Sequence, residues 1–194
     1  MLNQFTFNRR RKLKGVIFSE LIRWVEEEFS PEIADAMILS SHTEREGVYT
    51  SVGNYPHQDA ISLLVALQEL AGKEVPILAK QYGYWLAPRF ATLYPEIFRG
   101  YTDLRTFLRD IDAHHHMEMK KLYPDAKTPS VVALIDGEEI AISYASHRPF
   151  AHVAHGLIEG YAKYFDQSVS VERDDDDKSG NFARFVVRAA GAEQ

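Results

Sequence analysis

The sequence predicts an α+β fold, in which a helical N-terminal half packs on a small C-terminal antiparallel sheet with one inserted helix. Three observations support this prediction. Apolar residues recur at helical spacing from Gly15 to about Tyr123. From Ser130 onward the period changes to the two-residue alternation of strands. A further helical stretch, residues 150–165, then separates the first two predicted strands from the last two, which is an α+β order.

The helical half contains clear start and stop signals. Ser30 followed by Pro31 is typical of an N-cap and the first position of a helix. Gly72 is a natural C-terminal stop, and Pro88 is expected to kink or break the helix that contains it. Thr102 can cap a last helix, which Pro124 discourages from continuing. The predicted helices cover residues 15–29, a short stretch from 31, 56–71, 75–94 and 102–123, and 40–55 is expected to be a loop with a short extended piece at 48–50.

The second half contains strand signals. Two β-rich runs, residues 130–135 and 139–146, meet at Asp136-Gly137, which favours a tight hairpin turn. Two more strands are predicted at residues 169–172 and 182–187, with the acidic stretch Asp174–Asp177 between them. These four strands form the expected sheet.

The composition excludes several classes of chemistry. The chain has 194 residues, eight histidines, no cysteine and a net charge of −6. Without cysteine there can be no thiolate nucleophile, cysteine-ligated zinc or iron–sulfur cluster. No apolar run approaches the ~18 residues of a membrane span, so we expect a cytoplasmic protein with no membrane partner. A basic N-terminal extension, residues 1–12, is expected to precede a single domain of residues 13–190, and we predict no nucleic-acid partner.

Three consecutive histidines, His114, His115 and His116, are the densest chemical signal. Side chains of consecutive helical residues point about 100° apart, so the three cannot jointly bind one metal ion from a regular helix. His152 and His155 have a usable spacing but no third ligand, and no His-Glu-x-x-His motif occurs. A zinc hydrolase is therefore disfavoured. One histidine could still serve as the axial ligand of a haem.

The segment Tyr144-x-Ser146-x-Arg148 is the second signal. Residues two apart in a strand share a face, so a phenol, a hydroxyl and a guanidinium would lie side by side. All three can donate hydrogen bonds, and arginine binds carboxylates in bidentate fashion. This pattern favours an anionic ligand with one or two carboxylates, although an ordinary polar edge strand would look the same.

Taken together, these segments resemble the H-NOX family, the haem–nitric oxide/oxygen binding domains related to the haem domain of soluble guanylate cyclase. The stretch from His116 to Pro129 resembles the family's haem-ligand helix, and Tyr144-x-Ser146-x-Arg148 resembles its signature for the haem propionates. The resemblance continues in residues 14–17, 94–96 and 156–160. It covers residues 13 to about 188 and implies a bacterial, stand-alone gas sensor that is not an enzyme.

Two arguments nominate different histidines as the iron ligand. The apolar stripe of the predicted helix contains His115, together with Leu104, Leu108, Ile111, Met119 and Leu122. The family pattern instead places the ligand ten residues before Ala126 and thirteen before Pro129, which selects His116. We follow the family spacing and predict His116.

The resemblance implies a haem b, with the iron bound by His116, the propionates bound by Tyr144, Ser146 and Arg148, and Pro129 pressing on the porphyrin. The implied distal residues are Ile17, Leu21, Leu86, Phe90, Val153 and Leu157. Val153 stands where oxygen-binding members of the family carry a tyrosine, and it cannot donate a hydrogen bond. We therefore predict that the ferrous protein binds nitric oxide and CO but forms no stable oxygen complex, unless His152 turns inward.

The resemblance also implies how a signal would leave the domain. Nitric oxide would weaken the iron–His116 bond, the haem would relax, and a partner protein would be signalled in trans. The expected partner is a sensor histidine kinase or a cyclic-di-GMP enzyme. Three alternatives remain at this point: a haem-based oxygen or redox sensor, a His-dependent enzyme, and an interaction domain without cofactor.

Overall fold

The computed structural model describes residues 12–174 and 177–190, and it divides into two compact units, Met1–Tyr82 and Gly83–Gln194. Arg9, Arg10 and Arg11 of the basic extension lie outside the described residues. Within the described part of the chain, no helix is long and apolar enough to cross a membrane.

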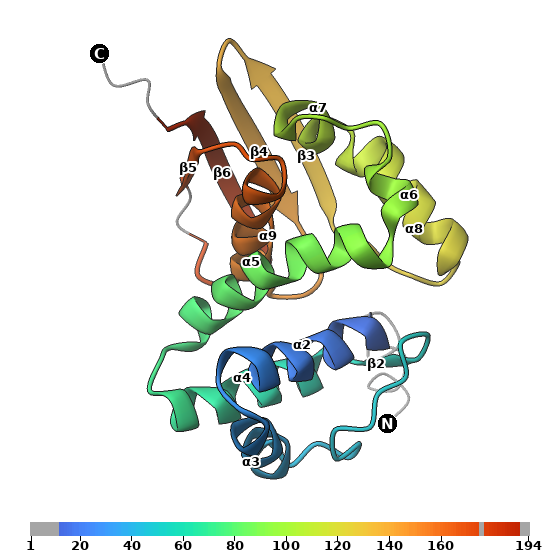
Figure 1. The fold of residues 1–194 in the computed structure, drawn as a ribbon, viewed down its shortest axis with the longest axis vertical. Helices are drawn as coiled ribbons and strands as arrows, with labels where there is room; N and C mark the ends of the chain where they lie inside the picture. The colour runs from blue at the N-terminus through green and yellow to red at the C-terminus, as the bar shows by residue number, and fades with distance from the viewer. Residues whose placement is uncertain (1–11, 175–176, 191–194) are drawn as a thin grey trace, which may run out of the picture. The chain divides into compact units, whose positions relative to one another are not determined.

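The first unit is helical, as Figure 1 shows. It contains α2 (Gly15–Glu28), α3 (Pro31–Ser41), α4 (His57–Ala71) and the beginning of α5 (Val75–Leu93), and α3 packs against both α2 and α4. Ser30 caps α3 as predicted, because its hydroxyl accepts a hydrogen bond from the amide of Ile33 at 3.2 Å. Gly72 ends α4 in the left-handed conformation. The largest fully buried side chains of this unit are Trp24, Phe18, Leu21, Met37, Leu63, Leu67 and Leu78.

A short two-stranded sheet, which has no clear signal in the sequence, completes the first unit. β1 (Lys12–Lys14) pairs antiparallel with β2 (Asn54–Pro56), and Leu13 lies opposite Tyr55. Residues 48–50, expected to be extended, form no strand. A three-residue strand depends on its partner more than on its own sequence, so local patterns do not reveal it.

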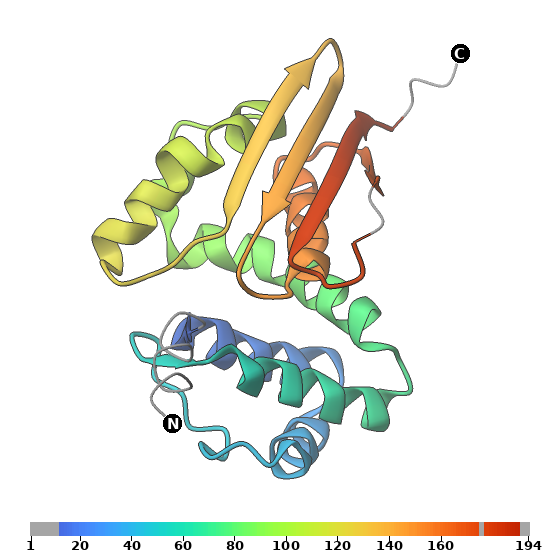
Figure 2. The ribbon, with the colours of Figure 1, turned by 180° about the vertical axis from the view of Figure 1, so that it is seen from behind.

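The second unit is built on a four-stranded antiparallel sheet of β3 (Ser130–Asp136), β4 (Glu139–Ala145), β5 (Val169–Arg173) and β6 (Phe182–Ala189). The strands lie in the order β3-β4-β6-β5, and the predicted hairpin turn at Asp136-Gly137 joins β3 to β4. Helix α9 (Ala151–Tyr164) and the helices before β3 cover one face of the sheet, and Figure 2 shows the other face uncovered. The predicted α+β class is confirmed.

The helices before β3 are shorter than predicted. α5 ends at Leu93, having continued through Pro88, and α6 (Pro95–Phe98) follows. The single helix expected over residues 102–123 is instead α7 (Leu104–Arg109), the π-helix η1 (Ile111–His115) and α8 (His116–Leu122). Its N-cap is Asp103 and not Thr102, because the Asp103 carboxylate accepts the amide of Thr106 at 2.8 Å.

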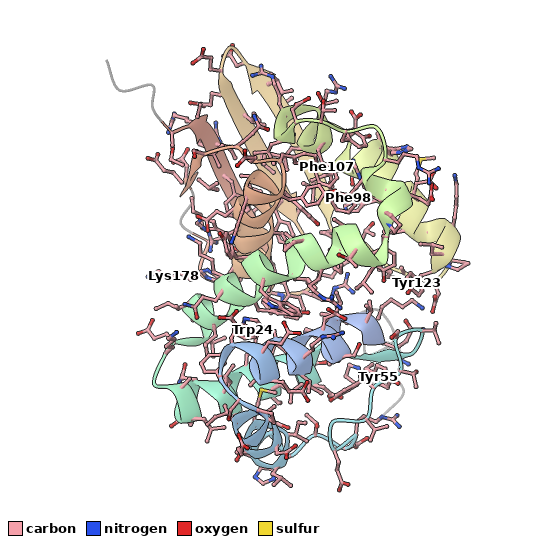
Figure 3. All side chains as sticks on the ribbon, viewed as in Figure 1. Trp24, Tyr55, Phe98, Phe107, Tyr123 and Lys178 are labelled. Carbon is pink, nitrogen blue, oxygen red and sulfur yellow. The ribbon has the colours of Figure 1, made fainter. Side chains whose placement is uncertain are left out.

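Aromatic side chains form much of the core between these helices and the sheet. Phe98 of α6 and Phe107 of α7 stack with ring centroids 4.8 Å apart, and Figure 3 shows the two side chains converging. Tyr161 of α9 meets Phe107 at 4.8 Å, and Phe185 of β6 is fully buried. This core supports the segment that contains the three histidines.

Candidate functional site

The π-helix η1 determines which way each of the three histidines points. The amide of His115 bonds the carbonyl of Asp110, and that of His116 bonds the carbonyl of Ile111, both five residues back instead of four. A π-helix therefore accommodates one residue more than the α-helices on either side of it. Such one-turn insertions occur often at functional sites.

His115 is part of the hydrophobic core. Its side chain is 5% exposed and lies 4.3 Å from the ring of Phe107 and 5.0 Å from that of Tyr101. Neither ring nitrogen has a hydrogen-bond partner of normal geometry, and the backbone of Phe107 is only a small influence that favours the protonated ring. Burial lowers the pKa of His115 to about 4, with the neighbouring His114 contributing. His115 is therefore a neutral, core-filling ring, as the apolar stripe predicts.

His116 has different surroundings. Its side chain is 12% exposed, and Nδ1 lies 2.9 Å from Oδ1 of Asp112. Burial lowers the pKa of His116, so the ring is neutral at physiological pH. An ionised carboxylate can only accept hydrogen bonds, so the proton is on Nδ1 and the lone pair is on Nε2. Neutral imidazole with a free Nε2 lone pair is the form that ligates a metal.

Only Tyr144 lies in β4, which ends at Ala145 and not at the predicted residue 146; Ser146 and Arg148 lie in the loop that follows, so a shared strand face does not explain their placement. The three are still neighbours, because Ser146 hydrogen-bonds with the Tyr144 side chain and the charge of Arg148 acts on it. Tyr144 and Arg148 are buried, Ser146 is partly buried, and the residues between them, Ala145 and His147, are exposed. The Ser146 hydroxyl accepts the backbone amide of Arg148 at 3.1 Å. Burial raises the pKa of Tyr144, so its phenol stays a neutral donor, while burial lowers the pKa of the Arg148 guanidinium.

Arg148 connects the loop after β4 to the loop before β3. Its side chain is 7% exposed, and the guanidinium donates to the carbonyl of Lys127. Pro129, two residues further along the same loop, is partly buried. A buried guanidinium is costly unless its donors are satisfied, and a carboxylate satisfies two of them at once. The donor set of this segment therefore fits an acidic ligand.

The apolar residues predicted to be distal are distributed over three helices. Leu86 and Phe90 lie on the part of α5 that belongs to the second unit, and Val153 and Leu157 lie on α9. α5 and α9 cross closely, because a Cβ on Gly83 would lie 2.1 Å from the carbonyl oxygen of Val153. The remaining two, Ile17 and Leu21, lie on α2 in the first unit, where Leu21 is buried.

His152, which was considered as a possible polar residue of the distal pocket, contacts the sheet. Its Nε2 lies 3.4 Å from the guanidinium of Arg173 on β5. One turn later, Nε2 of His155 lies 3.2 Å from the carbonyl oxygen of Val171 on the same strand. Both histidines of α9 thus lie on the side of the helix that packs against β5.

Residues 14–173 match the model of the family described as Haem-NO-binding. The chain belongs to this family. Its members are haem-based gas sensor domains that bind gaseous ligands and signal to partner proteins. Among residues 12–174 and 177–190, no three His, Cys, Asp or Glu side chains are grouped so that they could hold a metal ion by themselves.

Solved H-NOX structures share this fold. The Fe(II) unliganded H-NOX protein from K. algicida is 28% identical, with a TM-score of 0.85 over 94% of this chain and 99% of that one. An H-NOX protein from S. oneidensis in the Fe(II)NO ligation state is 22% identical, with a TM-score of 0.85 over 92% and 100%. A mutant H-NOX of T. Tengcongensis is 26% identical, with a TM-score of 0.77 over 91% and 96%. No curated protein matches the chain.

Sequence reasoning missed Asp112, the partner of His116. The four-residue interval between them was visible in the sequence and would place both on one side of a helix. It also missed the contact between Arg148 and Lys127, which depends on how the loop before β3 folds back.

Proposed function

We propose that this H-NOX domain, residues 13–190, is a nitric oxide sensor that binds haem b through His116 and signals in trans. The observation that supports the proposal best is the state of His116 within a family of haem proteins. Its ring is neutral and sheltered, its Nδ1 is bonded to Asp112, and its Nε2 carries the lone pair. His115, in contrast, is surrounded by Phe107 and Tyr101 in the core.

The other residues of the second unit have complementary roles in this proposal. The haem supplies the iron to which a diatomic gas binds. Tyr144, Ser146 and Arg148 would donate hydrogen bonds to its propionate carboxylates, and Pro129 would contact the porphyrin. The support for this assignment is the interaction of Tyr144 with Ser146 and Arg148 and the buried guanidinium of Arg148.

The distal side chains are proposed to set ligand choice. Leu86, Phe90, Val153 and Leu157 are all apolar, so none of them donates a hydrogen bond to a gas ligand. Dioxygen depends on such a donor more than nitric oxide or CO does, so we propose binding of nitric oxide and CO without stable oxygen binding. Ile17 and Leu21 are proposed as further haem neighbours on the resemblance alone.

The output is proposed to reach a separate protein, either a sensor histidine kinase or a cyclic-di-GMP enzyme. The domain itself is proposed to have no catalytic activity. Family membership supports a sensor that signals to a partner. A weakened bond between the iron and His116 would be the trigger in this proposal, because His116 begins α8 and directly follows the π-helix that packs against β3.

The test is the absorption spectrum of the purified ferrous protein without gas, with nitric oxide and in air. We expect a haem Soret band that moves with nitric oxide and does not change to a stable new form in air. His116→Gly should lose the haem or require added imidazole, whereas His115→Leu, the matched control, should keep it. Absence of a Soret band after expression with adequate haem, or haem loss in His115→Leu alone, would overturn the proposal.

A further inference from the structure

One hydrogen bond distinguishes His116 from the two histidines before it. Its Nδ1 lies 2.9 Å from the carboxylate of Asp112, and Asp112 is the second residue of the π-helix. Both nitrogens of His115 are buried without a partner, and among the described residues no acceptor meets the ring of the exposed His114. Only His116 therefore has a fixed ring orientation imposed by an acidic neighbour.

We propose that Asp112 is a positioning residue for the haem iron, acting through His116; this inference rests on the function proposed above. Its carboxylate holds the proton on Nδ1, directs Nε2 away from the helix for ligation, and makes Nε2 a stronger donor. A carboxylate behind a metal-bound histidine has this effect in general, because partial negative charge on the ring raises its basicity.

The surroundings of the pair determine how large the effect is. The Asp112 side chain is 45% exposed, so water screens part of its charge. Lys120, one turn after His116, acts in the opposite direction and disfavours positive charge on the ring. Sheltering of His116 strengthens the hydrogen bond itself, since a charge-assisted bond is stronger away from water. We therefore expect Asp112 to have a moderate but measurable influence on the donor strength of His116 Nε2.

Two substitutions separate the hydrogen bond from the charge. Asp112→Asn keeps an acceptor for Nδ1 but removes the negative charge, and Asp112→Ala removes both. Glu118→Gln is the matched control, because Glu118 lies two residues after His116, pairs with Lys121 and undergoes the same change of charge. All are studied as the full chain loaded with haem.

The measurements are the iron–histidine stretching frequency of the ferrous protein by resonance Raman spectroscopy, the haem reduction potential, and the rate of haem transfer to apomyoglobin. We expect the frequency to fall and the potential to rise in Asp112→Asn, with larger changes in Asp112→Ala. Haem transfer should accelerate by about 10- to 100-fold in Asp112→Ala, the usual effect of losing such a partner. Glu118→Gln should match the wild type in all three.

The outcomes distinguish this inference from the proposed function. If the wild type shows an iron–histidine band that His116→Gly abolishes, the proposed ligand stands. An unchanged band and potential in both Asp112 variants would then overturn the role of Asp112 alone. Equal changes in Glu118→Gln would also overturn it, because a general loss of surface charge would explain them. If the wild type shows no such band, the proposed function itself fails.

Discussion

Replacing His115 with leucine should stabilise the protein. The His115 ring is buried against Phe107 and Tyr101, with both nitrogens unpartnered. A buried polar group without a partner costs ~1–3 kcal/mol. Leucine has a similar volume and no polar atom, so it removes that cost. It also gives up aromatic contacts worth ~0.5–1.5 kcal/mol.

At the middle of each range the balance is a gain of about 1 kcal/mol in the free energy of unfolding, which rests on the unsatisfied nitrogens. A domain of this size gains ~2–4 °C in Tm per kcal/mol, so we expect a rise of roughly 2–4 °C. Urea denaturation followed by circular dichroism measures the free energy, provided that the slope of the transition stays the same and the haem content is matched.

His115→Ala is the contrasting variant. It removes the same polar atoms but leaves a cavity beside Phe107, so its stability should fall below that of His115→Leu. A loss of more than about 1 kcal/mol in His115→Leu would refute the reasoning, since a side chain with unsatisfied nitrogens has little to lose beyond its aromatic contacts. Such a loss would mean that His115 has a polar partner.

Three further outcomes are expected. Gly83→Ala should lower the free energy of unfolding by ~1–3 kcal/mol in urea denaturation, because the added Cβ would press on the backbone of Val153. A rise in the free energy of unfolding, which is the usual result in an exposed helix, would contradict the close crossing of α5 and α9. Asp177→Asn should be less stable than the wild type near neutral pH, because hydrogen bonds from Phe182 and Ser179 lower the pKa of the Asp177 carboxyl. That difference should narrow once the pH falls below the ordinary aspartate pKa of 3.8, and a constant difference would argue against it. Val153→Tyr should give a ferrous spectrum that changes reversibly in air, and an unchanged spectrum would remove Val153 from the distal set.

Elements with strong local signals could be predicted from the sequence. Ser30 with Pro31 starts α3, Gly72 ends α4, and the turn at Asp136-Gly137 joins β3 to β4. In each case a single residue type satisfies a backbone requirement within a few positions, so no distant partner is needed. The segment from Tyr144 to Arg148 was predicted as one strand, but β4 ends at Ala145, and Ser146 and Arg148 lie in the loop that follows it.

Elements that depend on distant partners, or on a choice between equivalent residues, could not be predicted. The strands β1 and β2 exist through their pairing, and neither has a strong pattern of its own. Thr102 and Asp103 are both good N-caps, and only the bonds from Thr106 decide for Asp103. The contact of Arg148 with Lys127 likewise requires the folded loop.

The one-residue disagreement between His115 and His116 has a structural explanation. Counting forward from Leu104 along the apolar stripe gives His115, and up to that point the stripe is buried at Leu104, Leu108 and His115 and partly buried at Ile111. Counting back from Pro129 gives His116. The π-helix lies between these two starting points and contains one residue more than an α-helical path would.

Beyond the π-helix the stripe loses its buried face: α8 has no buried residue, and Leu122 is 58% exposed. Helical periodicity therefore identified the core-facing histidine correctly but could not extend past the insertion. The count from Pro129 refers to the segment after the insertion, where His116 begins α8. Deleting one residue from Ile111–His115 should convert the π-helix to an α-helix. The histidine in line with the apolar stripe and the histidine thirteen residues before Pro129 would then be the same residue. Such a deletion would remove either the buried ring or the Asp112–His116 bond, so the extra residue is what allows this chain to have both.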